Sequence, residues 1–548
     1  MRNPAATLPA PTGTPVALDA PLEEAPARRW AIVAAVAGLT AAGAAIRFVP
    51  LGVQSFHHDE VITVMRVIPG SFGHMLHEVK TSESNPPLYY VLAWGWARAF
   101  GRDEWGIRSL SALLGTLTVA LGYPIGRQLA SRRVGLVLAG LLAFNPMLIW
   151  YSQEARSYAL LVFFGALSFL FFLRALDSRG RPRELALWAL ASALALGSHY
   201  FAFFAVGIEA AWLAVALRHR WKVVLPALAA VGAAGAALLP LISAQTNPNH
   251  IGWIEESALG ERFFQTGVSF LIGETGHVIA EPPRVHYAVL PAIAVALAAL
   301  TLLALGSRRE RRGGAIALAV GIGVLALAGA AALLGKDYVV ERNLLPALVP
   351  LAAVLALGLG AARARLVGVL VAVALCAYWL AFDVYVTQTP NLQRPDYRGV
   401  AKALGPPRVP RAIVSWRLAG DPLRWYLGDG AMRWYGGGEA VREVDLVGKR
   451  NVAEHAANLP PEFRLAGVER MQRLTIARYV SSTPVLLWMH ELNALQTGYA
   501  TNTIVLDGPP ASRPTLGERA RTAPSHALAA RRALEAATPR RPEAGAAR

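Results

Sequence analysis

Residues 307–335 read SRRERRGGAIALAVGIGVLALAGAAALLG, a cluster of four arginines followed by a long apolar run. The run from residue 314 to residue 335 contains no charged side chain. A helix needs about 20 apolar residues to cross the hydrocarbon core of a bilayer, so this run is long enough to span a membrane. Because Lys and Arg gather at the cytoplasmic ends of spanning helices, the arginines also predict which end faces the cytoplasm.

The composition of the whole chain is typical of a membrane protein. Of the 548 residues, 54% are hydrophobic and 16% are charged, whereas about a quarter of the residues are charged in soluble domains. The net charge of +17 does not indicate a nucleic-acid partner, because the basic residues occur in short clusters between apolar runs. The single cysteine, Cys376, excludes an intrachain disulfide and a cysteine metal cage.

Apolar runs of near-spanning length recur along the chain. They predict a polytopic α-helical membrane protein with about 11 transmembrane helices, at roughly 30–49, 107–130, 134–150, 157–176, 184–199, 201–217, 222–243, 286–306, 314–335, 344–362 and 366–386. Basic clusters fall in every second connection, at Arg28/Arg29, Arg132/Arg133, Arg179/Arg181/Arg183, Arg218/Arg220/Lys222, Arg308/Arg309/Arg311/Arg312 and Arg363/Arg365. This alternation predicts a multi-pass protein of the cytoplasmic membrane with a cytoplasmic N-terminus and an extracytoplasmic C-terminus.

The chain divides into four predicted regions. Residues 1–29 form a disordered cytoplasmic N-terminus, and residues 30–386 form a transmembrane domain whose first outer loop covers 50–106. In residues 387–510, RAIVSW, EVDLV, PVLLWMHEL and TNTIVLDG are typical of strands and DPLRWYLG of a helix, which predicts a small extracytoplasmic α/β domain. Residues 511–548 are rich in Ala, Arg and Pro and predict a disordered basic tail.

The first outer loop contains a second apolar segment, SNPPLYYVLAWGWARAF, at residues 84–100. Its Pro-Pro turn and its aromatic residues favour a helix that lies along the membrane interface, with Tyr89 as a candidate for substrate contact. A short spanning helix is the alternative, but it would break the alternation of the basic clusters.

Two histidines and two acids follow the first apolar run directly, in FHHDEVITVMRV at residues 56–67. A carboxylate at the membrane edge can accept a proton from an incoming hydroxyl, so Asp59 is a candidate catalytic base. His57 and His58 are candidate substrate ligands, and His58, Asp59 and Glu60 could hold a divalent cation. The structural alternative is a helix start with Ser55 as N-cap and acids in the first turn.

The next candidates lie in NPMLIWYSQEARSYALL, at residues 145–161. Glu154 and Arg156 are two residues apart and cannot face each other on a helix, whereas Glu154 and Tyr158 could. A guanidinium offers forked donors to phosphate oxygens, so Arg156 is a candidate ligand for a lipid phosphate. A snorkelling arginine, or one that pairs with a distant acid, is the alternative.

Two further outer connections carry polar residues. His199 and Tyr200 occupy the corner between two short predicted helices, where polar side chains face a cavity or serve as structural groups. In GKDYVVERN, Lys336 or Arg342 could bind phosphate, and a solvated loop is the alternative. A reaction on this side of the membrane cannot draw on cytoplasmic nucleotide sugars, so a lipid-carried donor is the natural substrate, with a base for the acceptor and positive charge for the departing phosphate.

Four segments together resemble a known family: HDE at 58–60, NPPLYYVLAWGW at 85–96, SQEARSYALL at 152–161 and ERNLLPALVPLAAVLALGL at 341–359. They resemble the GT-C membrane glycosyltransferases, and more narrowly the bacterial protein O-mannosyltransferase and aminoarabinose transferase group. QRPDYRGVAKAL, which follows the last apolar run, also resembles a segment frequent in bacterial members. The resemblance covers roughly residues 30–400.

The resemblance implies an inverting transfer of a sugar from a polyprenyl-phosphate donor to an acceptor hydroxyl at the outer membrane face. The enzyme would be a mannosyltransferase-like hexosyl- or pentosyltransferase, and its acceptor a glycan, a lipid or a protein. Family practice maps the catalytic carboxylate onto Asp59, with Glu60 as supporting acid. Arg156 and Arg342 become the candidate ligands of the lipid phosphate.

One position departs from the pattern of the family. Some relatives carry a basic residue just before the double proline, where this chain has Asn85, so Lys80 or an arginine would have to replace it. Metal dependence varies within the superfamily, which leaves a divalent cation open. Two other classes of function stay open as well: a transporter or lipid flippase for envelope precursors, and a scaffold for an envelope-building complex.

Overall fold

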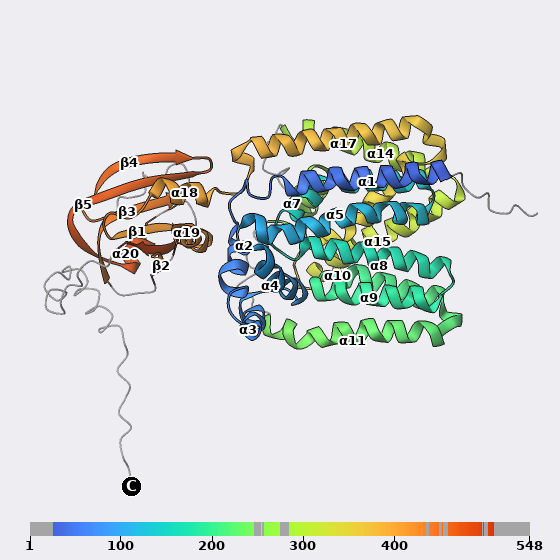
Figure 1. Ribbon diagram of the computed structural model, residues 1–548, viewed down its shortest axis with the longest axis horizontal. Coiled ribbons are helices and arrows are strands. Elements are labelled where there is room, and N and C mark those ends of the chain that lie inside the picture. The colour runs from blue at the N-terminus through green and yellow to red at the C-terminus, as the bar shows by residue number, and fades with distance from the viewer. Residues whose placement is uncertain are drawn as a thin grey trace, which may run out of the picture.

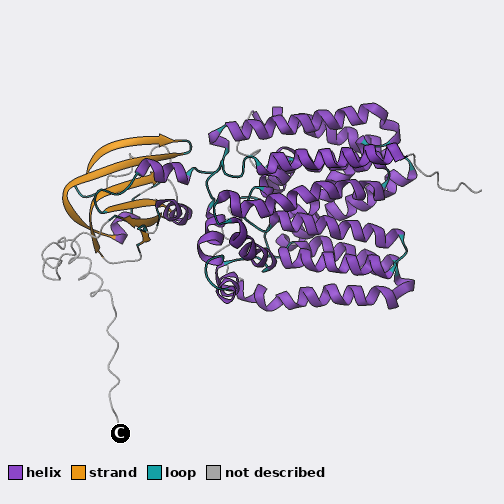
Figure 2. Cartoon of the chain, in the orientation of Figure 1, coloured by secondary structure: helices purple, strands orange, loops and turns teal. Residues whose placement is uncertain are grey.

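The computed structural model describes residues 26–245, 254, 257–273, 284–428, 430–434, 438–448, 452, 459–495, 497 and 502–508. Residues 1–29 and 511–548 are predicted to be disordered. Of these, residues 1–25 and 511–548 lie outside the described part of the chain. The chain folds into a helical bundle followed by a sheet, and all strands of the described residues lie at the sheet end (Figure 2).

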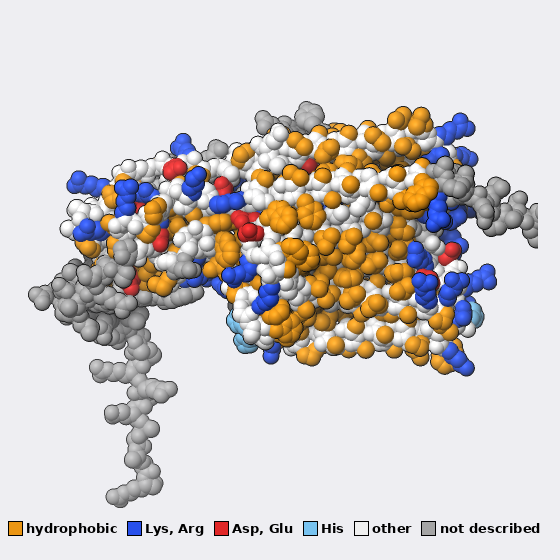
Figure 3. Space-filling view, in the orientation of Figure 1, with side chains coloured by type: hydrophobic (Ala, Val, Ile, Leu, Met, Phe, Trp, Pro, Cys, Tyr) orange, Lys and Arg blue, Asp and Glu red, His pale blue; other side chains and the backbone are white. Residues whose placement is uncertain are grey.

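Helices lie side by side in the bundle, and the axes of the long ones are nearly parallel (Figure 1). They are α1 (Pro26–Phe48), α5 (Glu104–Leu129), α6 (Arg132–Phe144), α7 (Pro146–Ser152), α8 (Tyr158–Asp177), α9 (Pro182–Ser198), α10 (Ala202–Ala216), α11 (Trp221–Gln245), α14 (Arg284–Ala304), α15 (Arg308–Leu333), α16 (Leu348–Leu359) and α17 (Arg365–Gln388). The amphipathic α12 (Leu259–Ile272) packs beside α7 and α14. The side of the bundle is apolar, and Lys and Arg gather at the end away from the sheet (Figure 3).

The chain is an integral membrane protein. Seven helices among the described residues are long and apolar enough to cross a membrane, and the bent pair α6–α7 makes up to eight. Every predicted apolar run lies on a helix, but α9 has 17 residues and α10 has 15, which is short for a span. The count of 11 spans and the orientation of the termini therefore stay predictions.

The run predicted at 134–150 is not one straight helix. The chain bends by 56° between α6 and α7, at Asn145 and Pro146. Proline lacks the N–H that would continue the ladder of α6, and the Asn145 side chain instead accepts from Leu148 N at 3.1 Å. Arg47 of α1 satisfies the freed carbonyl groups, because its Nη1 donates to Ala143 O at 2.9 Å. The buried guanidinium of Arg47 thus stabilises the bend.

Short helices fill the first outer loop: α2 (His58–Ile62), a π-helical turn (Thr63–Val67), α3 (Phe72–Ser82) and α4 (Leu88–Phe100). The predicted helix in 84–100 is α4, and its location at the membrane interface stays a prediction. Ser55 is not the N-cap of α2, which was the structural alternative. His57 takes that place, and its N–H donates to Glu60 Oε2 at 3.0 Å.

A six-stranded mixed sheet follows the bundle, in the order β2-β6-β1-β3-β5-β4. Its elements are α18 (Tyr397–Leu404), β1 (Arg411–Trp416), α19 (Gly420–Leu427), β2 (Met432–Arg433), β3 (Gly438–Gly448), β4 (Arg464–Met471), β5 (Leu474–Trp488), α20 (Met489–Asn493) and β6 (Asn502–Asp507). Strands β1 and β3 run parallel, and the other pairs are antiparallel. Three of the four segments predicted as strands lie in strands. In the fourth, PVLLWMHEL, the first part belongs to β5 and the rest to α20.

Candidate active site

Glu60 is the most tightly held acid of the first outer loop. Its side chain is out of solvent, and Arg108 of α5 donates to its two oxygens from Nε and Nη2, each at 2.7 Å. Ala155 N donates to Oε1 as well, at 2.9 Å. Burial raises the pKa of Glu60, but the charge and hydrogen bonds of Arg108 outweigh it and lower the pKa to about 2. Glu60 is therefore an ionised anchor of the loop.

Asp59 differs from its neighbour because its carboxylate accepts no hydrogen bond from the described part of the chain. Burial alone would raise the pKa of this carboxyl group. The positive charges of Arg156 and Arg342, with the two adjacent histidines, instead hold the pKa well below its usual range. The Asp59 carboxylate is therefore ionised and open to a proton, while the two arginines make it a weak base.

Arg156 is bound to an acid that the sequence reasoning missed. Its Nη1 lies 2.8 Å and 2.9 Å from the two oxygens of Glu83, and Tyr90 donates to the same carboxylate at 2.6 Å. Nη1 also donates to Thr63 Oγ1 at 3.2 Å and to Asp59 O at 3.3 Å. The pairing with a distant acid, left open as an alternative, is therefore what the structure has. Within the described part of the chain, Nε and Nη2 of Arg156 have no hydrogen-bond partner and remain for a ligand.

Helical spacing allowed a contact between Glu154 and Tyr158, but no hydrogen bond joins them among the described residues. Its carboxylate accepts from Arg394 Nη2 at 2.8 Å. The ring of Tyr158 packs instead against Tyr151, with centroids 4.8 Å apart, and against His199, with centroids 5.7 Å apart. Glu154 thus belongs to an ion pair, and Tyr158 to an aromatic cluster.

Arg342 is the second residue of the helical turn Glu341–Ala347, which continues into α16, and its charge acts on Asp59, His57 and Glu154. The structure therefore brings this predicted phosphate ligand to the predicted base. His199 faces the same region. Its burial and the charges of Arg156 and Arg342 lower its pKa to about 3, so the imidazole is neutral.

Tyr200, Tyr89 and Lys80 lie around the site, and their role as substrate ligands stays a prediction. The hydroxyl of Tyr200 donates to Gln245 Oε1 at 2.6 Å, and Gln245 Nε2 donates to the carbonyl of Asn85 at 3.1 Å. Tyr89 is fully buried against Tyr90, with ring centroids 5.5 Å apart. Lys80 is exposed in the last turn of α3, where no contact within the described residues joins it to Asp59, and its part in donor binding stays a prediction.

The geometry does not support a cation held by His58, Asp59 and Glu60. Among the described residues, no group of three His, Cys, Asp or Glu side chains is placed to hold a metal ion. Glu60 turns to Arg108, while His58 faces Asp421 and Arg433 of the sheet domain. Burial, the largest of several influences, lowers the pKa of His58 to about 4.

The sheet domain packs on the first outer loop. Arg66 Nη2 lies 2.7 Å from Asp421 Oδ2, and the rings of Phe56 and Trp425 meet edge to face with centroids 5.8 Å apart. Tyr426 accepts from Phe56 N at 2.7 Å. The HHDE stretch therefore lies between the bundle and α19, rather than on an open surface.

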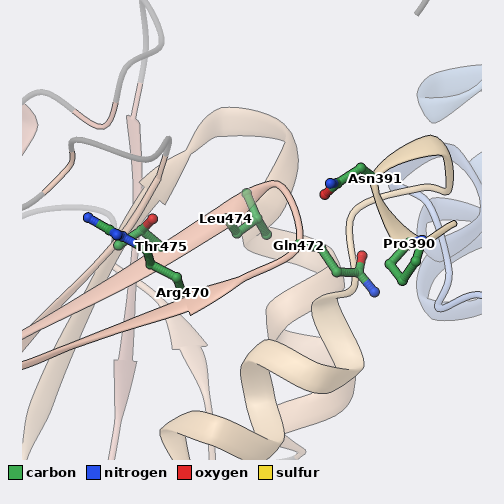
Figure 4. A pocket seen from close by; sticks show the side chains of 6 residues that line it. All are labelled: Pro390, Asn391, Arg470, Gln472, Leu474 and Thr475. Atoms are coloured by element: carbon green, nitrogen blue, oxygen red, sulfur yellow. The ribbon is translucent and has the colours of Figure 1, made fainter. Parts of the chain in front are cut away.

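A separate cavity of about 730 Å³ opens where the segment after α17 meets the β4–β5 hairpin (Figure 4). Its lining residues are Pro390, Asn391, Arg470, Gln472, Leu474 and Thr475. None of them belongs to the cluster around Asp59, so the cavity is not part of the candidate active site.

Three charged residues of the site escaped the sequence reasoning: Glu83, Arg108 and Arg394. Each lies far along the chain from its partner, with separations of 73 residues for Arg156 and Glu83, 48 for Arg108 and Glu60, and 240 for Arg394 and Glu154. The one available signal was the position of Arg394 in the quoted segment QRPDYRGVAKAL.

Fold and site together define a polytopic membrane protein with a centre of acids and arginines in the long loop after its first helix. Residues 84–243 match the family model described as dolichyl-phosphate-mannose-protein mannosyltransferase. The chain is similar to the apo crystal structure of ArnT from Cupriavidus metallidurans, with a TM-score of 0.54, 13% identity, and 83% of this chain and 98% of that chain covered.

The crystal structure of the same ArnT bound to undecaprenyl phosphate is similar as well, with a TM-score of 0.51, 13% identity, and 84% of this chain and 99% of that chain covered. No curated protein sequence matches the chain. At this identity the likeness shows the fold. The resemblance to the GT-C membrane glycosyltransferases that the motifs indicate is confirmed, by the matched segment and by the shared fold.

Proposed function

We propose that the protein is an inverting glycosyltransferase that moves a sugar from a polyprenyl-phosphate donor to an acceptor hydroxyl at the outer face of the cytoplasmic membrane. The observation that carries this proposal is the uncommitted carboxylate of Asp59 in the field of Arg156 and Arg342. Asp59 takes the proton of the acceptor hydroxyl as its oxygen attacks the anomeric carbon. The bond from that carbon to the phosphate breaks, and the lipid phosphate leaves with the electron pair.

The charges around Asp59 suit a donor that is itself an anion. The arginines hold the pKa of Asp59 well below its usual range, which keeps the carboxylate ionised but makes it a weak base. A phosphate beside Arg342 would offset part of this positive field. The basicity of Asp59 would then rise when the donor is bound, so donor binding would prepare the base for the acceptor.

Arg342 is the principal phosphate ligand in this proposal, because its positive charge acts on Asp59, His57 and Glu154 together. Arg156 supplies charge to Asp59 and its remaining nitrogens to the donor. Glu60 takes no proton in the reaction, since its two oxygens are held by Arg108 and by backbone N–H groups. Glu60 is a positioning residue here, in place of the predicted supporting acid.

Two comparisons support the choice of donor and sugar. The ArnT with a similar fold has a crystal structure with bound undecaprenyl phosphate, and the matched family model is described by a mannosyl donor linked to a dolichyl phosphate. We propose a mannose-like hexose as the first sugar to test, and a protein, glycan or lipid hydroxyl as acceptor. Eleven spans, a cytoplasmic N-terminus and an extracytoplasmic sheet domain complete the proposal.

The test compares wild type with Asp59→Asn, purified in lipid, against a panel of polyprenyl-phosphate sugars. The amide keeps the shape of the side chain but cannot take a proton, so we expect transfer to be lost while donor binding persists. Full transfer by Asp59→Asn would remove Asp59 as the base. A wild-type protein that binds no polyprenyl-phosphate sugar would contradict the donor class and favour a transporter.

A further inference from the structure

The chain between α17 and α18 is fastened to the first outer loop over consecutive residues. We call Gln393–Tyr397 the strap. Ser55 Oγ donates to Pro395 O at 2.9 Å and accepts from Tyr397 N at 3.1 Å. Gln393 Nε2 donates to Val386 O at 3.4 Å, which ties the start of the strap to the end of α17. The strap is thus a bound part of the loop.

The Arg394 side chain points from the strap into the cluster of acids. Its Nη2 lies 2.8 Å from Glu154 Oε2, and its Nη1 lies 3.5 Å from Glu60 Oε2. The guanidinium also lies over the ring of Trp150, 4.6 Å from the ring centroid. All three charged side chains are under 10% exposed, so water contributes little to their balance.

The two acids that Arg394 bridges stand next to the reacting groups of the proposed mechanism. Glu60 directly follows Asp59, and Glu154 lies two residues before Arg156. Glu60 has Arg108 as a second partner, whereas Arg394 is the one cation within 4.0 Å of Glu154 among the described residues. The like charges of Glu60 and Glu154 repel each other, and the guanidinium between them offsets this repulsion.

We propose that Arg394 is a positioning residue for glycosyl transfer, which sets the spacing between Asp59 and Arg156 by bridging Glu60 and Glu154. This inference rests on the proposed function. Arg394 touches neither donor nor acceptor in it. The site begins at the HHDE stretch, just after α1. The strap, which follows α17, completes it.

Replacement of Arg394 should lower kcat more than it changes donor binding. A misplacement of about 1 Å can cost about 100-fold in rate, so we expect Arg394→Gln to lower kcat by about 10- to 100-fold with donor KM within about 3-fold of wild type. Arg394→Lys should recover part of kcat, because one ammonium keeps the charge but cannot fork to two carboxylates. The matched control is Arg398→Gln, four residues on, whose exposed guanidinium donates to Gly52 O and Val53 O.

The double variant Arg394→Gln/Glu154→Gln separates positioning from charge balance, because it leaves no unpaired charge at Glu154. A positioning role predicts a restored unfolding temperature while kcat stays low. Recovery of both would overturn the proposal and leave Arg394 as a counter-ion only.

A measurement without turnover keeps this test apart from the proposed function. We expect amide hydrogen exchange of residues 55–62 to rise in Arg394→Gln and to stay at the wild-type level in Arg398→Gln. Unchanged exchange in Arg394→Gln would refute the bridge even if the protein transfers sugar. Increased exchange in a protein that binds no polyprenyl-phosphate sugar would sustain the bridge and refute the donor class alone.

Discussion

Glu60 and Arg108 form a two-pronged ion pair, with both nitrogen–oxygen distances at 2.7 Å and neither side chain more than 1% exposed. Arg108 also donates to the carbonyl groups of Leu51, Gln54 and Ser55. One guanidinium thus fixes the end of the first predicted span and the start of α2 together. This ion pair therefore holds in place the stretch of chain that carries Asp59.

The first prediction concerns the loss of the ion pair between Glu60 and Arg108. Arg108→Met leaves a buried carboxylate with part of its charge uncompensated, and removal of one partner of a buried pair costs about 3–5 kcal/mol. We expect a loss of this order in the free energy of unfolding, measured by denaturant titration in detergent. Arg102→Met, at an exposed position of the same loop, is the control. Equal stability of the two variants would contradict the role of the pair.

The second prediction is that protonation of Glu60 lowers the stability of the fold at low pH. Its pKa falls from an ordinary 4.5 to about 2 in the folded chain. A depressed carboxyl pKa stabilises the fold above the unfolded pKa, so this contribution should be complete above pH 4.5 and disappear as the pH falls toward about 2. Unfolding temperatures of wild type and Glu60→Gln, measured across this range, should converge at the acid end. Parallel curves would show that Glu60 does not titrate there.

The third prediction addresses the contact between the bundle and the sheet domain. Asp421 is 2% exposed and accepts from three arginines, Arg66, Arg424 and Arg433. Asp421→Asn removes the pair with Arg66 across the contact and also leaves three neighbouring guanidinium groups without their counter-charge, whereas Arg66→Gln removes only the pair across the contact. We expect the Asp421 variant to be cleaved between residues 389 and 410 by added protease faster than the Arg66 variant. Equal cleavage rates would mean that the charge of Asp421 is not what holds the contact.

The fourth prediction tests the close approach of α5 and α6. A Cβ atom on Gly126 would lie 2.7 Å from Gly135 Cα, and one on Gly122 would lie 2.7 Å from Ala139 Cα. Small residues four apart allow the backbones of membrane helices to meet in this way. Gly126→Ala should therefore lower the unfolding temperature. Gly232→Ala on α11, where a Cβ would meet nothing within 4 Å, should leave it unchanged or raise it.

Several features of the fold could be predicted because they depend on local sequence. The apolar runs predict helices, since any segment that crosses a bilayer must bury its own backbone. Strands β1, β3 and β6 carry the apolar residues of a packed sheet. Strand β4 was missed because it is an edge strand with seven of its eight residues exposed, so RLAGVERM shows no apolar alternation.

Of the site, the sequence predicted the candidate base Asp59 but not the ion pairs around it. Asp59 stood out because an uncompensated acid next to an apolar run needs a reason. The partners of the arginines could not be assigned, because a short-range pattern contains no information on which distant acid a long side chain reaches. Arg156 was assigned to phosphate and is found with Glu83, and Glu60 was assigned to the reaction and is found with Arg108.

The strap also fixes the order in which the site can be completed during synthesis. Glu60 leaves the ribosome early, and its partners follow 48 residues later at Arg108, 95 at Ala155 and 334 at Arg394. By the time Arg394 is translated, every helix of the bundle has already been made. A nascent chain halfway through insertion therefore holds Asp59 without Arg394 nearby, and the site is complete only after the chain beyond α17 has been made.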